Sequence, residues 1–130
     1  MREIKFRAWD SVEERMYYPG DIKLSVDFFG DIYDDGEKPP KNVSYRTKIM
    51  QFTGLHDKNG KEIYEDDLWF CDGCQYLVQW TGAYASFNLV AIEQDNKHTG
   101  EILEMFHAFK GEVIGNIYTN PELLDNAKGN

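Results

Sequence analysis

The chain has 130 residues, which is enough for one domain with a sizeable core and too few for two ordinary domains. Eight Tyr, eight Phe and three Trp favour β-strands and argue against disorder over most of the chain. The net charge of −9 lies entirely in residues 62–130, which hold three basic and twelve acidic side chains. General nucleic-acid binding is therefore disfavoured, because phosphate contacts need clustered Lys and Arg.

The sequence also bears on the compartment. No apolar run has the length of a transmembrane helix, and the N-terminus has no hydrophobic signal core. We therefore expect a cytoplasmic protein, whose two cysteines would stay reduced.

Residues 1–46 are expected to form N-terminal hairpins and one loop. Ile4, Phe6 and Ala8 alternate with residues of the other face, which predicts a strand with one buried face, and residues 16–18 are expected to return as its partner. Residues 22–28 show the cleanest two-residue alternation in the chain.

Gly30-Asp31 is suited to a hairpin turn from that segment into Ile32-Tyr33. Residues 34–42 include Pro39-Pro40 and are predicted to be a surface loop, followed by a strand over residues 43–52.

The central stretch, residues 49–70, has the strongest turn signal in the sequence. Residues 57–60 read Asp-Lys-Asn-Gly, in which Asp bonds its own downstream backbone and Asn-Gly accepts positive φ. The acidic corner Glu65-Asp66-Asp67 then leads into the apolar residues 68–70, as at the entry of a strand into a small barrel.

Residues 68–92 are expected to form a meander of three strands. The strands cover residues 68–70, 75–80 and 84–92, with turns at residues 71–74 and 81–83. This pattern resembles small SH3-like barrels, and the analogy concerns architecture only.

The C-terminal part is predicted to contain four segments. Residues 95–100 form a loop, and residues 101–110 are compatible with a helix or a strand, of which we favour the strand. Residues 112–118 are expected to form a strand with a bulge or a close approach at Gly115. Asn120-Pro121 starts a short helix over residues 121–125, with Asn120 as its cap.

Three motifs resemble the YopX-like proteins of bacteriophages and prophages: Ile4–Asp10, Gln51–Leu68 and Glu112–Leu124. The resemblance implies an almost entirely β fold, a phage or prophage source and cytoplasmic residence, and it carries over no catalytic or ligand-binding residue. One departure is Asp66, where the family usually has Gly, so the corner before residue 68 is expected to be built differently if that glycine serves a positive-φ turn.

The fold class expected from these observations is all-β and mainly antiparallel: a small SH3-like barrel or meander with N-terminal hairpins and a short C-terminal helix. We expect a single domain over residues 1–130, made of N-terminal strands and a loop (1–46), a barrel-like portion (47–125) and a frayed tail (126–130).

The clearest candidate for chemistry is the pair Cys71 and Cys74. A CxxC pair can act in redox catalysis or bind zinc with His98 and His107, but redox pairs open a helix and zinc sites show a second compact pair. The favoured interpretation is two reduced cysteines that flank a tight hairpin.

Two other groups have a structural interpretation that outweighs a functional one. Glu65 and Asp67 could converge on a divalent cation, but an exposed polar corner is favoured. Trp9, Trp69 and Trp80 could form a stacking platform for bases or sugars, but core positions are favoured. His56, beside the turn, is expected to be solvated.

No catalytic, cofactor-binding or metal-binding residue is assigned, and no cofactor is expected. The favoured function is a non-catalytic accessory protein that acts through protein–protein contact or self-assembly as a homo-oligomer. The alternatives are an acidic, DNA-mimicking inhibitor of a host nucleic-acid-binding protein, and a metal-binding or enzymatic protein that uses Cys71 and Cys74.

Overall fold

The computed structural model describes residues 3–21, 24–36, 38–92 and 102–127, and the chain divides into two compact units. One unit consists of residues 5–50, and the other of residues 51–130 together with residues 1–4. We call them the N-terminal and C-terminal units. The prediction for residues 95–100 and for the end of the tail lies outside the described residues.

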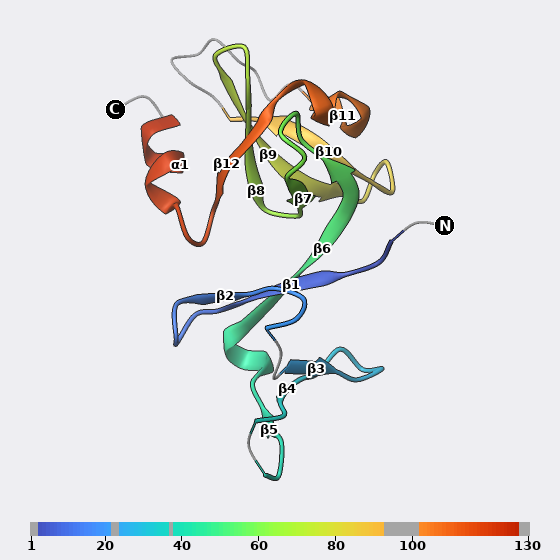
Figure 1. Ribbon diagram of the computed structural model, residues 1–130, viewed down its shortest axis with the longest axis vertical. Helices are drawn as coiled ribbons and strands as arrows, with labels where there is room; N and C mark the ends of the chain where they lie inside the picture. The colour runs from blue at the N-terminus through green and yellow to red at the C-terminus, as the bar shows by residue number, and fades with distance from the viewer. Residues whose placement is uncertain (1–2, 22–23, 37, 93–101, 128–130) are drawn as a thin grey trace. The chain divides into compact units, whose positions relative to one another are not determined.

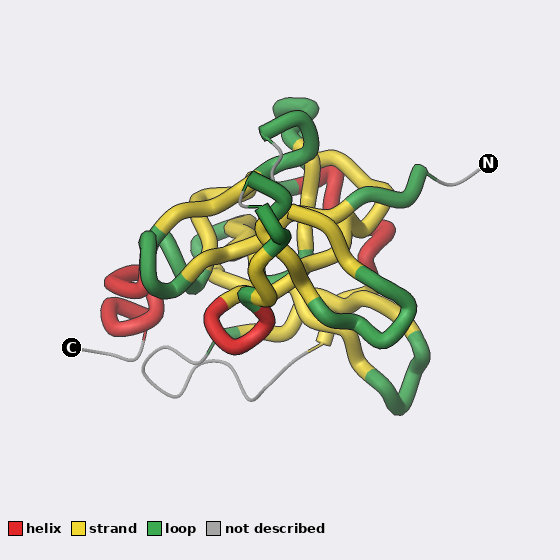
Figure 2. The backbone as a smooth tube through the Cα atoms, turned by 90° about the horizontal axis from the view of Figure 1, so that it is seen from below, coloured by secondary structure: helices red, strands yellow, loops and turns green. Residues whose placement is uncertain are grey.

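The described residues form an almost entirely β fold, as the sequence predicts (Figures 1 and 2). The strand pairs whose partner residues are assigned are all antiparallel. The regular α-helix among the described residues is the short one at the C-terminal end. None of the described helices is both long and apolar enough to span a bilayer.

The N-terminal unit contains two small sheets. In the first, β1 (Phe6–Asp10) lies between β2 (Arg15–Tyr17) and β6 (Thr47–His56), which continues into the other unit. The second sheet has the order β3 (Leu24–Val26), β4 (Ile32–Asp34), β5 (Lys41–Asn42). A 3-10 helix, η1 (Ser44–Arg46), precedes β6, so the predicted strand over residues 43–52 begins later than expected.

The buried face predicted for β1 is correct only for Ala8. Ile4 and Phe6 of that face are exposed, whereas Arg7 of the opposite face is buried. The Arg7 Nε–H donates to the sulfur of Met50 at 3.4 Å and its guanidinium lies 6.0 Å from the ring centre of Tyr18, so a charged side chain is accommodated on the inner face. The predicted loop over residues 34–42 is also shorter, because β4 and β5 pair across it.

The C-terminal unit is organised by a five-stranded antiparallel sheet that curves as a half-barrel. Its order is β11 (Ile102–Glu104), β10 (Ser86–Ala91), β9 (Cys74–Thr81), β8 (Asp67–Cys71), β12 (Glu112–Asn116). The meander predicted for residues 68–92 is therefore confirmed. A short strand, β7 (Glu62–Tyr64), pairs with the second half of β6.

Side chains that alternate along the sheet form the core of this unit, since residues i and i+2 of a strand share a face. Its buried members include Trp69, Val78 and Leu89. The 3-10 helix η2 (Met105–Lys110) covers them, and the Trp69 indole donates to the carbonyl of Ala108 at 3.0 Å. The strand favoured for residues 101–110 is thus correct only for β11, because Met105 and Ala108 both pack into the core and their spacing of three residues suits the tighter turns of η2.

The C-terminal predictions are largely confirmed. β12 pairs with β8 with an irregularity between Val113 and Gly115, and α1 spans Pro121–Ala127. The side-chain oxygen of Asn120 accepts the backbone N–H of Asn116 at 3.2 Å, a contact that the sequence did not predict.

Candidate functional site

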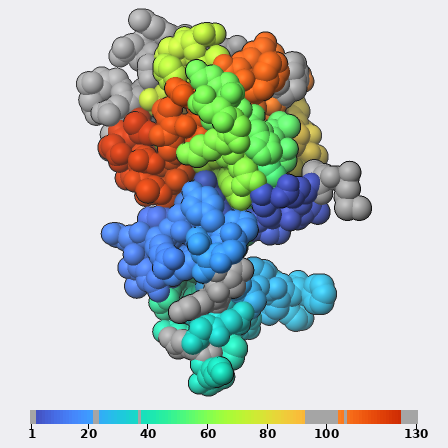
Figure 3. All heavy atoms as spheres, in the orientation of Figure 1, coloured from blue at the N-terminus to red at the C-terminus, as the bar shows by residue number. Residues whose placement is uncertain are grey.

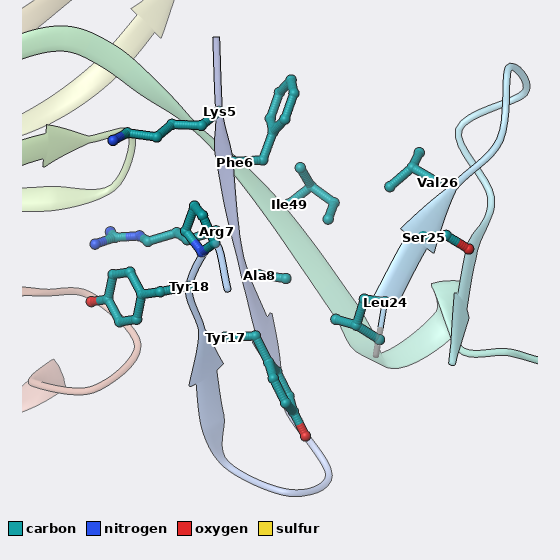
Figure 4. A pocket seen from close by; sticks show the side chains of 11 residues that line it. Lys5, Phe6, Arg7, Ala8, Tyr17, Tyr18, Leu24, Ser25, Val26 and Ile49 are labelled. Atoms are coloured by element: carbon teal, nitrogen blue, oxygen red, sulfur yellow. The ribbon is translucent and has the colours of Figure 1, made fainter. Parts of the chain in front are cut away.

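The candidate site is an apolar groove in the N-terminal unit. Figure 4 shows Phe6 and Ile49 on one wall, from β1 and β6, and Leu24 and Val26 on the other, from β3. The hollow has a volume of about 280 Å³. We call this hollow the apolar groove; its lining also includes Ala8, Tyr17, Tyr18, Pro19, Ser25 and the two basic residues Lys5 and Arg7.

The groove exists because β1 and β3 turn their apolar side chains toward a common space that no other described residue of this unit fills. Phe6 and Val26 keep about half of their surface exposed, at 49% and 54%. Burial of such a side chain stabilises a protein by about 1.5–3 kcal/mol. Covering the exposed surface of these two residues would therefore stabilise a contact at the groove.

A second apolar feature lies at the end of the β3–β4 hairpin. Phe28 and Phe29, which we call the tip, are both fully exposed, at 108% and 92%. Figure 3 shows the light-blue atoms of this hairpin standing out from the rest of residues 5–50. The predicted alternation through Phe28 therefore ends at Val26, before the tip.

The turn holds the tip outward by its own hydrogen bonds. The Asp27 carboxylate accepts the backbone N–H groups of Phe29 at 2.9 Å and Asp31 at 3.0 Å. Gly30 supplies the positive φ, +86°, that closes the turn. The two phenylalanines are thus presented on a closed turn, and the hairpin predicted at Gly30-Asp31 is confirmed.

A polar hollow of about 280 Å³ lies in the same unit, lined by charged side chains that include Asp10, Glu13, Arg15 and Arg46. Asp10 lies 2.9 Å from Arg46 Nε and also accepts two backbone N–H groups of the β1–β2 turn. Burial lowers the pKa of Arg46, but the charge of Asp10 and the interaction with Tyr45 together outweigh it and leave the pKa raised. The ion pairs of Arg46 with Asp10 and Glu13 stabilise the turn between β1 and β2. With Asp21 and Asp34 the lining as a whole has four carboxylates and two guanidinium groups.

Cys71 ends β8 and Cys74 begins β9, so the two cysteines lie opposite each other across the turn of this hairpin. Both are free thiols, and burial, followed by the charge of Asp72, raises the pKa of Cys71. A raised pKa disfavours the thiolate that redox catalysis and zinc binding require. Within the described residues no three His, Cys, Asp or Glu side chains gather as a metal site; His98 lies outside them.

The acidic corner differs from the exposed one expected. Asp67 is 1% exposed, and its carboxylate accepts the backbone N–H of Tyr64 at 2.8 Å. Asp66 adopts a left-handed conformation, φ +70°, and accepts the Tyr118 hydroxyl at 3.0 Å. The turn therefore keeps the positive φ that a glycine would supply, and no cation is needed to explain the three carboxylates.

The aromatic residues divide between core and surface. Trp69 is buried as predicted, Trp9 is half-buried, and the core position predicted for Trp80 is wrong, because 52% of that side chain is exposed. His56 is exposed, as expected. Neither the apolar groove nor the exposure of Trp80 could be predicted from the sequence, since both depend on which residues lie opposite in the fold.

Comparisons with a family model and with solved structures agree with this architecture. A family model described as "YopX protein" matches residues 5–125. Protein EF1440 from Enterococcus faecalis has a similar structure, with a TM-score of 0.63 and 25% sequence identity over 95% of this chain and 99% of that one. Protein yopX from Bacillus subtilis is similar at a TM-score of 0.59 and 22% identity, covering 95% and 97% of the two chains. No curated protein matches the sequence.

Proposed function

The chain belongs to the YopX protein family, and from this premise we propose that it is a non-catalytic accessory protein that acts by protein–protein contact, first of all with a second copy of itself. Neither the family match nor the described residues indicate catalysis. Its setting would be the cytoplasm of a bacterium that carries a phage or prophage.

The observation that carries the proposal is the tip beside the apolar groove. Two adjacent, fully exposed phenylalanines on a closed turn are costly to leave in water, and exposed apolar patches of this kind mark contact surfaces. One unit thus carries both a protruding aromatic pair and an apolar hollow. A two-fold symmetric pair could place each tip in the groove of the other copy, since a two-fold interface uses the same patch twice.

The areas are compatible with a stable pair. A phenylalanine buries roughly 150–250 Å², so the four side chains of two tips would bury roughly 600–1,000 Å². The walls of the two grooves would lose a similar area. The total then reaches the range of about 1,200–2,000 Å² that is typical of specific interfaces.

Size-exclusion chromatography with light scattering, run at several protein concentrations, tests the proposal. We expect a discrete dimer for the natural chain and a monomer for the double variant Phe28→Ser, Phe29→Ser. Tyr45→Ser is the matched control, because Tyr45 is a 75% exposed aromatic of the same unit outside the groove. A natural chain that stays monomeric at every concentration, or a dimer that both variants leave intact, would contradict the proposal.

The alternative of an acidic inhibitor rests on the charge of the C-terminal unit. Residues 1–4 and 51–130 hold six basic and fourteen acidic side chains, a net −8, whereas residues 5–50 have a net −1. A host DNA-binding protein captured at low salt and released at high salt would favour this alternative. Capture would then persist in the Phe28, Phe29 double variant, because the tip belongs to the other unit.

A further inference from the structure

Trp80 and Phe87 form an aromatic pair at the margin of the C-terminal core. They are register partners of β9 and β10, with ring centres 5.1 Å apart and planes at 74°. By the alternation of strands they share a face with Val78 and Leu89, which are fully buried. Trp80 thus lies on the core face of the sheet and yet keeps half of its surface in solvent.

Polar residues explain this exposure. Two neighbouring hollows, of about 330 and 270 Å³, share Trp80, Phe87 and Gln51 of β6. The first is also lined by Thr53, Ser86, Ala85 and Met105, and the second by Glu65. An aromatic surface is therefore bordered by amide, hydroxyl and carboxylate groups, and we call this region the Trp80 groove.

The charge of the unit restricts what the groove can bind. The net −8 of the C-terminal unit repels phosphates and acidic peptides. A cation placed over an indole face gains about 0.5–1 kcal/mol at an exposed site and more when water is excluded. Guanidinium is the best fit, because it is planar, stacks on aromatic rings and donates five hydrogen bonds.

We propose that the Trp80 groove binds an arginine side chain of a partner peptide. The guanidinium stacks on Trp80 and donates to the carboxylate of Glu65 and the side-chain oxygen of Gln51. Glu65 already accepts the backbone N–H of Gln51 at 3.3 Å, which fixes one of its oxygens at the groove, and a carboxylate has about four acceptor positions. This site is independent of the proposed function, since it lies in the other unit.

A nuclear magnetic resonance titration of the 15N-labelled full chain tests the site. The probe is the peptide acetyl-Gly-Arg-Gly-amide, and its control contains citrulline, which has the shape of arginine without the charge. We expect saturable shifts of the Trp80 indole N–H and the Gln51 backbone N–H with the arginine peptide. With the citrulline peptide we expect binding at least about fivefold weaker.

Variants separate the contributions. Trp80→Ala should weaken binding about tenfold, whereas Tyr84→Ala, an exposed aromatic of the same hairpin outside the hollows, should leave it unchanged. Glu65→Gln keeps an acceptor for Gln51 but removes the charge, and it should weaken binding and reduce its dependence on salt.

Two outcomes of the peptide titration would overturn the inference: equal shifts with the arginine and citrulline peptides, or no saturable shift at the Trp80 indole in the natural chain. A third is binding of maltotriose, a sugar that can stack on an indole, at this site in place of the arginine peptide. The peptide comparison in the natural chain decides the matter even if Trp80→Ala does not fold.

Discussion

Asp57 shows how one carboxylate links a local turn to a distant strand. One oxygen accepts the backbone N–H groups of Asn59 and Lys61, both at 2.9 Å, which closes the turn between β6 and β7. The other accepts the N–H of Val113 at 2.8 Å, at the start of β12. Burial raises the pKa of Asp57, but these hydrogen bonds, helped by the charge of Lys61, outweigh it and leave the pKa lowered.

A lowered pKa in the folded state means that Asp57 stabilises the protein above its unfolded pKa, near 3.8, and that this contribution is lost as the pH falls through the folded value. We expect Asp57→Asn to lower the free energy of unfolding at pH 7 by about 2 kcal/mol, since charge-assisted hydrogen bonds are lost. Urea unfolding at pH 7 and pH 3 measures it. The deficit should shrink at pH 3, and an equal deficit at both values would contradict the assigned role.

Asp66 combines a cost and a gain at one position. Its φ of +70° is strained for a residue with a side chain, while its carboxylate accepts the Tyr118 hydroxyl. Asp66→Gly relieves the strain and loses the bond, so unfolding free energy should change by less than about 1 kcal/mol. Asp66→Ala loses the bond and retains the strain, and should be less stable than the glycine variant by about 1–2 kcal/mol.

Urea unfolding of the two Asp66 variants and of Tyr118→Phe checks this division. The phenylalanine variant removes the same hydroxyl while leaving the backbone of residue 66 unchanged. An alanine variant as stable as the glycine variant would show that the left-handed conformation costs nothing here.

At the scale of elements, residues that accept positive φ determine where the hairpins turn. Glycine at a tight contact determines whether another element can pack against a strand. Asp72 and Gly73 both have positive φ, +51° and +81°, which is the two-residue turn that joins β8 to β9. Gly111 has another role, because it lies between η2 and β12 against the core. A Cβ atom there would lie 2.5 Å from the Phe70 carbonyl oxygen and 2.5 Å from the Trp69 indole.

Gly111→Ala should therefore lower the free energy of unfolding by about 2–3 kcal/mol, the upper part of the range for overpacking, because a backbone oxygen and a buried indole cannot both move aside. Gly82→Ala is the matched control, since nothing lies within 4 Å of a Cβ at that position. Thermal or urea unfolding of the two variants measures the difference. A Gly111 variant as stable as the control would mean that η2 can shift away from β8.

At the scale of the whole molecule, the net charge is concentrated in one unit. The tip and the apolar groove belong to residues 5–50, while almost all of the net charge belongs to the other unit, which also exposes Trp80, Tyr84 and Phe109. Apolar contact is insensitive to moderate salt, whereas attraction between opposite charges is largely screened beyond about 10 Å at 0.1 M salt. The salt dependence of any assembly therefore identifies the unit that makes it.

The sequence by itself determined the strand order of the meander, the turns at residues 57–60 and 71–74, the bulge at Gly115 and the terminal helix. Each of these depends on local chemistry: two-residue alternation, the positive φ that Asn, Asp and Gly accept, and the fixed φ of proline. The family motifs were readable for the same reason, as they are concentrated at these turns and strands.

Only the tertiary structure decided which faces are covered. Alternation predicts two faces for β1 but does not say that Arg7 lies inside and Phe6 outside. Likewise, Trp69 and Trp80 are both aromatic residues of strands, and one is buried by η2 while the other borders Gln51 and is half exposed. Burial depends on residues distant in the chain, so the candidate surfaces of this protein could not be found before its strands were placed side by side.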